Sequence, residues 1–260
     1  MNKTVRAIRE LRRELLIKDQ PLKAYHLLQE AVKEYPELQN ELERTKKMLA
    51  HFFDPKEYRR SYSTNPSKGL ELIEPENSFQ HIPEMYFRFR WIAKEIKKIK
   101  PATYLDLACY AGTLVLWAAS QGIEATGVEL GKASSKIASE RAKKYHLPAT
   151  IYCGDLMDYT KKADIVSAFE IIEHMPDDNA FIKHVGGLAK RWAYITTPDG
   201  PYLNGWGNLG HWEYGGKSGE GHVRVYNKKT LKKLIESNGG VIDQLFVDGD
   251  ELLCAKFRIR

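Results

Sequence analysis

The sequence has few of the features that mark membrane-spanning and secreted proteins. Among its 260 residues, no apolar run approaches the roughly 18 residues that a membrane-spanning helix requires. The first residues, MNKTVRAIRELRREL, lack the apolar stretch and the small-residue cleavage site of a secretory signal. We therefore expect a cytoplasmic protein without a membrane span.

Cysteine is also scarce. The three cysteines lie in apolar, strand-like stretches and none belongs to a C-x-x-C pair; they are Cys109, Cys153 and Cys254. An odd number without metal-ligand spacing argues against both a disulfide framework and a zinc site. We expect three buried thiols.

A concentrated basic segment is absent as well. The net charge is +6, but the lysines are dispersed along predicted helices. Such a surface is compatible with a nucleic-acid partner without indicating one. With 43% hydrophobic and 28% charged residues, the composition is typical of a globular protein that buries a sizeable core.

The first fifth of the chain has helical periodicity, because leucine and other apolar residues recur every three or four positions. Pro21 and Pro36 interrupt this pattern. Proline is tolerated in a first helical turn but breaks a helix interior, so three short helices are predicted. Their predicted ends lie near Lys18, Tyr35 and Phe53.

These patterns divide the chain into three parts. Residues 1–56 form a helical segment that we expect to cap the site, select the substrate or support a homo-oligomer. Residues 57–83 are rich in proline, glycine and polar residues and are predicted to be a connector. Residues 84–260 have the alternating pattern of an α/β domain.

In that domain, predicted strands alternate with predicted helices. The strands are 103–109, 125–130, 149–155, 163–169, 191–198, 240–247 and 252–259, and the helices are 84–99, 112–122, 132–147, 177–190 and 227–240. Alternation of this kind indicates a doubly wound, mostly parallel sheet, and the two consecutive strands at the end indicate an antiparallel hairpin. The predicted fold is therefore α/β with a seven-stranded sheet.

Acidic residues end the first three predicted strands: Asp106, Glu129 and Asp155. In a doubly wound sheet, ligands bind at the carboxyl ends of the strands where the strand order reverses. Asp106 precedes a tight turn that opens a helix at Gly112. The G-x-G-x-x-G motif of an NAD-binding domain is absent after this strand, so another nucleotide-type ligand is favoured.

This order of strand, acid, turn and helix resembles the class I (Rossmann-like) S-adenosylmethionine-dependent methyltransferases. Their D-x-G-x-G-x-G signature corresponds to Asp106, Ala108, Tyr110 and Gly112, so two of three glycines are replaced. The resemblance implies S-adenosylmethionine as cofactor, with these four residues near its amino-acid end. It also implies that Glu129 accepts hydrogen bonds from the ribose hydroxyls.

By the same resemblance, Asp155 and Leu156 border the adenine, and Glu170 lies near the cofactor. Glu170 begins the sequence EIIEHM, which is similar to a branch containing ubiquinone-pathway O-methyltransferases and bacterial small-RNA 2′-O-methyltransferases. The latter use E-x-x-E-H and a distant histidine to hold a divalent metal. That resemblance implies a magnesium or manganese site made by Glu170, Glu173, His174 and His222.

Three interpretations of EIIEHM stay open. Glu170 caps backbone amides and His174 only hydrogen-bonds within the fold; or the four residues chelate a metal, which suits carboxylate and imidazole ligands; or His174 or His222 is a metal-free general base. In the second and third cases, His174 and His222 are catalytic residues.

A long connection, residues 198–226, separates the fifth strand from the last helix. Connections in α/β domains usually have two to six residues, so this length suggests a functional segment. Its aromatic side chains either stack on a sugar, an aromatic acceptor or a base, or pack the segment onto the N-terminal helices. The candidate substrate residues are Tyr202, Trp206, His211, Trp212 and Tyr214, with Arg224 for an anionic group.

The favoured function is O-methylation of a hydroxyl on a small molecule or glycan, with or without metal assistance. One alternative is RNA 2′-O-methylation. The other is a non-catalytic binding protein in which Ala108 and Tyr110 block the cofactor pocket.

Overall fold

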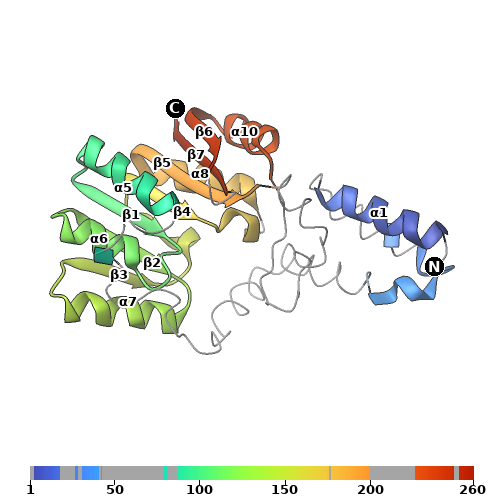
Figure 1. Ribbon diagram of the computed structural model, residues 1–260, viewed down its shortest axis with the longest axis horizontal. Helices are drawn as coiled ribbons and strands as arrows, with labels where there is room; N and C mark the ends of the chain where they lie inside the picture. Colours follow the sequence, from blue (N-terminus) through green and yellow to red (C-terminus); the bar gives the residue numbers. More distant parts are fainter. Residues whose placement is uncertain are drawn as a thin grey trace.

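The computed structural model describes residues 3–17, 27–28, 31–40, 42, 79–80, 87–175, 177–199, 226–248 and 252–260. Within these residues, one seven-stranded sheet has the order β3-β2-β1-β4-β5-β7-β6 (Figure 1). The strands are β1 (Thr103–Leu107), β2 (Glu124–Glu129), β3 (Ala149–Cys153), β4 (Ala163–Phe169), β5 (Ala189–Pro198), β6 (Gly240–Val247) and β7 (Leu252–Ile259).

The strand directions confirm the predicted topology. Strands β1 to β5 pair in parallel, whereas β7 pairs antiparallel with both β5 and β6. The strand order reverses at β1, between β2 and β4. The carboxyl end of β1 is therefore the expected ligand position in a sheet of this kind.

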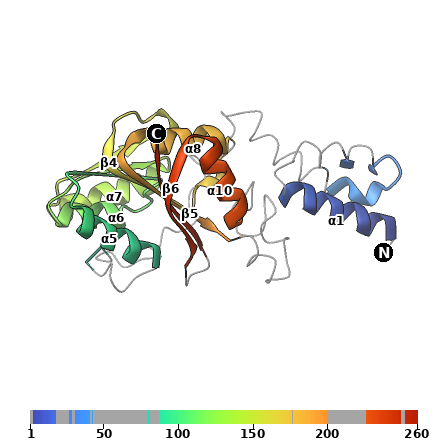
Figure 2. The same cartoon turned by 90° about the horizontal axis from the view of Figure 1, so that it is seen from above.

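Helices cover both faces of the sheet (Figure 2). The first face carries α5 (Phe87–Ile99), α6 (Thr113–Ser120) and α7 (Lys132–Lys144), and the second carries α8 (Asp178–Leu188) and α10 (Lys228–Ser237). Each layer has its own apolar core: Trp91 and Trp117 lie in the first, and Phe181 and Phe257 in the second. Burial of these side chains is the main stabilising term for such layers.

Local sequence signals mark several helix ends. Gly112 (φ 77°) precedes α6 and Gly122 (φ 78°) follows it, as predicted. A capping box between Asn227 and Thr230 begins α10. Helix α8 ends two residues earlier than predicted, because Ala189 already pairs with β4.

The N-terminal helices were predicted with one incorrect boundary. Helix α1 (Lys3–Ile17) confirms the first, and Val5 packs with Leu28 and Leu38 in a small apolar cluster. The second helix ends at Ala31, not near Tyr35, and a turn follows. Tyr35, the residue before proline, is outside the α conformation, and a 3₁₀ helix (Pro36–Leu38) starts directly after it. The predicted end at Phe53 lies outside the described residues.

A buried ionic network joins α5 to the C-terminal hairpin. Lys256 of β7 lies 2.8 Å from both Glu95 of α5 and Asp243 of β6, and its ammonium group lies 4.4 Å from the centre of the Trp192 ring. Burial alone would raise the pKa of Glu95, but hydrogen bonds from Lys256 and Tyr194 outweigh it and lower this pKa. The ionised pair is therefore the stable form in the fold.

The expectation of three buried thiols is wrong for one cysteine. Cys109 and Cys254 are buried, but Cys153 is exposed, because β3 is an edge strand whose last residues are open to solvent. Of the helices that the structure describes, none combines the length and the apolar character needed to cross a membrane.

Candidate cofactor site

The turn after β1 has an unusual backbone. Ala108 (φ 60°), Tyr110 (φ 49°) and Gly112 (φ 77°) all have left-handed conformations, which favour glycine. Gly112 is required sterically, because a Cβ there would lie 2.9 Å from the Cβ of Ala138. Ala108 and Tyr110 keep the conformation that glycine would adopt, at a cost of roughly 1 kcal/mol each. The two positions where the signature has glycine thus carry left-handed backbone in this chain as well.

The carboxylate of Glu129, at the end of β2, holds two turns together. One oxygen accepts a hydrogen bond from the Tyr110 amide (2.9 Å), and the other accepts one from the Gly131 amide (2.7 Å). Burial raises the pKa of Glu129, and these two amides partly oppose that effect. The carboxylate thus links the β1–α6 turn to the β2–α7 turn at the point where the strand order reverses.

Two adjacent cavities open at the carboxyl ends of the strands, and both are lined by Ala108. The larger has a volume of about 360 Å³, within the range of small-molecule sites. Its lining residues are Arg88, Phe89, Asp106, Ala108, Cys109, Tyr110, Ala111, Thr113, Leu114, Phe169 and Glu170. The smaller, of about 60 Å³, is lined by Ala108, Val128, Glu129, Leu130, Asp155, Leu156, Ile171 and Met175.

Seven of the eight predicted cofactor residues line one of these cavities; Gly112, the eighth, instead precedes the first turn of α6. Of the five non-glycine residues with positive φ in the described part of the chain, three line the larger cavity: Ala108, Tyr110 and Glu170. Strained backbone of this kind concentrates at functional sites.

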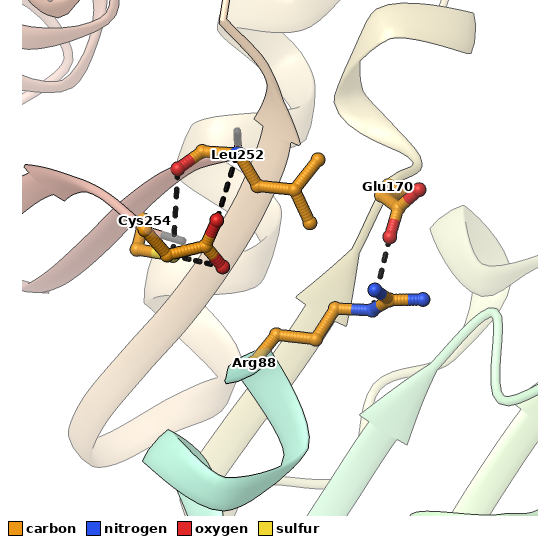
Figure 3. Close-up of polar contacts among 5 residues, drawn as sticks. Arg88, Glu170, Leu252 and Cys254 are labelled. Carbon is orange, nitrogen blue, oxygen red and sulfur yellow. Dashed lines mark hydrogen bonds and ion pairs between the residues drawn. The ribbon is translucent and has the colours of Figure 1, made fainter. Parts of the chain in front are cut away.

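Arg88 is a site residue that the sequence did not reveal. It projects from α5 toward Glu170, and the Arg88 Nε to Glu170 Oε1 distance is 2.9 Å (Figure 3). Both side chains line the larger cavity and are partly exposed. The sequence signal was weak, because Arg88 is one of several cations on an amphipathic helix and only packing brings it to the end of β4.

The loop after β3 is fixed from two sides. Asp155 accepts a hydrogen bond from the Met157 amide (2.8 Å) and so begins a 3₁₀ helix, Leu156–Asp158. The carbonyl oxygen of Leu156 lies 2.7 Å from Nε2 of His184 on α8. This contact requires the hydrogen on Nε2, because a carbonyl only accepts. His184 therefore holds the edge of the smaller cavity, a role that sequence reasoning missed.

The groups around the two cavities suit the cofactor that the resemblance implies. The carboxylates of Asp106 and Glu129 can accept from an ammonium group and from ribose hydroxyls, and Arg88 adds a cation for an anionic group. A ligand with an amino-acid end and a nucleoside end requires this combination.

The described residues do not support the metal hypothesis. A 3₁₀ helix, Ile172–His174, follows β4; Glu170 pairs with Arg88, Glu173 is buried, and His174 is partly exposed. No group of three or more histidine, cysteine, aspartate or glutamate side chains in the described ranges is arranged to hold a metal ion.

Part of the predicted site falls on residues that are not described. His222, the fourth ligand of the metal hypothesis, lies outside the described residues, as do the substrate candidates Tyr202, Trp206, His211, Trp212, Tyr214 and Arg224. Their assigned roles stay predictions.

The strand order, the antiparallel β7 and the acidic residues at the carboxyl ends of β1 and β2 define the class I S-adenosylmethionine-dependent methyltransferase fold. A family model described as a methyltransferase domain matches residues 79–245. The chain belongs to this methyltransferase-domain family.

A curated relative agrees with that membership, and two solved structures share the fold. Ubiquinone biosynthesis O-methyltransferase from Coxiella burnetii is 31% identical over 126 residues, covering 47% of this chain and 49% of that protein. The chain thus spans about half the length of this relative. A methyltransferase from Clostridium acetobutylicum has a TM-score of 0.56 at 16% identity, covering 70% of this chain and 98% of that one. Magnesium protoporphyrin IX methyltransferase from Synechocystis PCC 6803, with bound SAH, also has a TM-score of 0.56. It is 15% identical, and the match covers 83% of this chain and 100% of that one. Both structures support the fold.

Proposed function

We propose that this protein transfers a methyl group from S-adenosylmethionine to a hydroxyl oxygen of a small molecule or glycan. The observation that carries the proposal is the convergence of Asp106, Glu129, Glu170 and Arg88 on two cavities that share Ala108. The O-methyltransferase relatives support oxygen as the acceptor atom.

Two of these charged groups, Glu129 and Asp106, have distinct roles in this proposal. Glu129 uses one lone pair on each oxygen for the Tyr110 and Gly131 amides, so further lone pairs are available for ribose hydroxyls. Asp106 lines the larger cavity and accepts from the ammonium group of the cofactor. When bound, the cofactor supplies a methyl group on a positively charged sulfur, and in-line placement of the acceptor oxygen is then the main requirement.

The acceptor hydroxyl must also lose a proton. His174 follows β4 at the carboxyl edge of the sheet and is partly exposed, so it is a candidate general base. In the metal-assisted version, Glu170, Glu173, His174 and His222 would hold a magnesium or manganese ion, which would lower the pKa of a coordinated hydroxyl.

Isothermal titration with S-adenosylhomocysteine tests the cofactor assignment. The wild type should bind, whereas Glu129→Ala should bind more weakly by about 1–3 kcal/mol, since it loses charged hydrogen bonds. Glu129→Gln keeps one acceptor oxygen and should be intermediate. Glu140→Ala is the matched control, because Glu140 is an exposed carboxylate on α7. Thermal melts check that each variant is folded.

Failure of the wild type to bind would favour the non-catalytic alternative. Affinity unchanged in Glu129→Ala would remove Glu129 from the site. If binding is observed, an acceptor screen with EDTA, magnesium or manganese separates the metal-assisted mechanism from the histidine base. A steep loss of acceptor binding with salt would indicate RNA instead of a small molecule.

A further inference from the structure

Behind the larger cavity lies a chain of buried hydroxyl groups that the proposed function does not use. Ser167 of β4 is the direct neighbour of Asp106 across the β1–β4 pairing. Its Oγ donates to Oδ1 of Asp106 at 2.5 Å, and the Tyr104 hydroxyl lies 2.6 Å from the same Oγ. Ser167 is 0% exposed, Tyr104 1% and Asp106 5%.

The direction of these hydrogen bonds follows from the number of protons. An ionised carboxylate only accepts, so the single hydroxyl proton of Ser167 goes to Asp106. Ser167 Oγ is then the acceptor for Tyr104, whose hydroxyl must donate. The order is therefore Tyr104 to Ser167 to Asp106, and it ends on a carboxylate that lines the cavity.

The two hydroxyl groups reduce the free-energy cost of burying the ionised Asp106 carboxylate. Burial raises the pKa of Asp106 to about 7, the hydroxyls of Ser167 and Tyr104 oppose this shift, and the negative charge of Glu129 adds to it. The other charged groups that line the same cavity are Arg88 and Glu170. A hydrogen bond from a neutral hydroxyl stabilises the ionised form without neutralising it. Above this pKa the charge of Asp106 is therefore available to a cation in the cavity.

We propose that Ser167 and Tyr104 are positioning residues that hold the Asp106 carboxylate toward the ammonium group of the cofactor. They thereby favour ligands that carry the amino-acid end over those that lack it. This inference rests on the proposed function, and neither residue contacts the reacting atoms.

The test measures the affinity for two ligands across pH 5.5 to 8.5. S-adenosylhomocysteine carries the ammonium group, whereas 5′-methylthioadenosine has the same nucleoside without it. Ser167→Ala should lower the affinity for the first roughly tenfold, as expected for loss of one hydrogen bond to a charged group, with less than about twofold change for the second. Tyr104→Phe should also lower the affinity for S-adenosylhomocysteine more than that for 5′-methylthioadenosine. The loss should be smaller than in Ser167→Ala, because Ser167 still donates to Asp106.

The pH profile supplies a readout that a merely structural role would not change. S-adenosylhomocysteine affinity should fall as the pH drops and Asp106 becomes protonated. Without the Ser167 hydroxyl the ionised form is less stable, so the midpoint of this fall should move to higher pH in Ser167→Ala. Ser167→Thr, which keeps the hydroxyl, should restore the wild-type midpoint. Ser139→Ala removes a hydroxyl that bonds to the Ser135 carbonyl on α7 and should behave as wild type.

The outcomes are distinguishable. An unmoved midpoint in Ser167→Ala, or an equal loss of affinity for both ligands, overturns the positioning role while leaving the methyltransferase proposal intact. Failure of the wild type to bind S-adenosylhomocysteine overturns both. If Ser167→Ala does not fold, Tyr104→Phe carries the same comparison with its smaller expected shift of the midpoint, because it removes the other hydroxyl of the series.

Discussion

The negative charge of Asp106 destabilises the fold, but the proposed cofactor site requires it. At 5% exposure its ionised form is costly, and the raised pKa expresses that cost. In the unfolded chain the pKa is near the ordinary value of 3.8, and in the fold it is about 7. The folded state therefore holds the proton more strongly between these values, so stability is lost as the pH rises from about 4 to 7.

Asp106→Asn should remove this loss. The variant should gain stability relative to the wild type as the pH rises, by about 2 kcal/mol more at pH 8 than at pH 5, because only the wild type must ionise a buried carboxyl. Urea unfolding without ligand at both pH values measures the difference. An equal gain in stability at pH 5 and pH 8 would show that the charge of Asp106 is not the cause of the stabilisation.

The acidic residues of the site could be predicted because each lies at or just beyond the carboxyl end of a strand. Asp106, Glu129 and Asp155 follow from strand ends and the rule that parallel strands present their carboxyl ends at one edge. Arg88 and His184 could not be predicted as site residues, because their contacts depend on how α5 and α8 pack on the sheet. The sequence interpretation of Glu170 as a metal ligand left out its partner Arg88 for the same reason.

The contact between α5 and the C-terminal hairpin depends on charges inside the core. Lys256 is 4% exposed and Glu95 6%, and Asp243 completes the network at its more exposed end. Strand order and direction could be predicted from the alternating pattern. The ionic network could not be predicted, because the sequence does not distinguish a buried Glu95 or Lys256 from a surface charge on an amphipathic helix or an edge hairpin.

Lys256→Met should destabilise the fold by about 3–5 kcal/mol, since it leaves the Glu95 charge buried without its partner. Adding Glu95→Gln should recover part of this loss, because no unpaired carboxylate then remains. Urea unfolding of the two single variants and the double variant gives the coupling free energy. Additive losses would mean that the pair does not act as a unit. The Glu95 contribution should be retained above its ordinary pKa of 4.5 and lost as the pH falls below its lowered value in the fold.

The chain has two regions with separate apolar clusters. One apolar cluster, in the N-terminal helices, is formed by Val5, Leu28 and Leu38. All residues that line either of the two cavities lie between Arg88 and Met175. The family match starts at residue 79, so it also excludes the N-terminal helices. Cofactor binding and the function of residues 1–56 should therefore be separable.

Deletion of residues 1–56 should leave the dissociation constant for S-adenosylhomocysteine within about threefold of the intact chain, because no residue of either cavity is removed. A cap or a substrate-selecting segment predicts in addition a raised acceptor KM, whereas a dimerisation segment predicts a smaller sedimentation coefficient with an unchanged KM. Calorimetry, acceptor kinetics and sedimentation velocity on the same preparation separate these roles. Loss of S-adenosylhomocysteine binding from a truncated protein with an intact thermal transition would show instead that the N-terminal helices help to build the cofactor site.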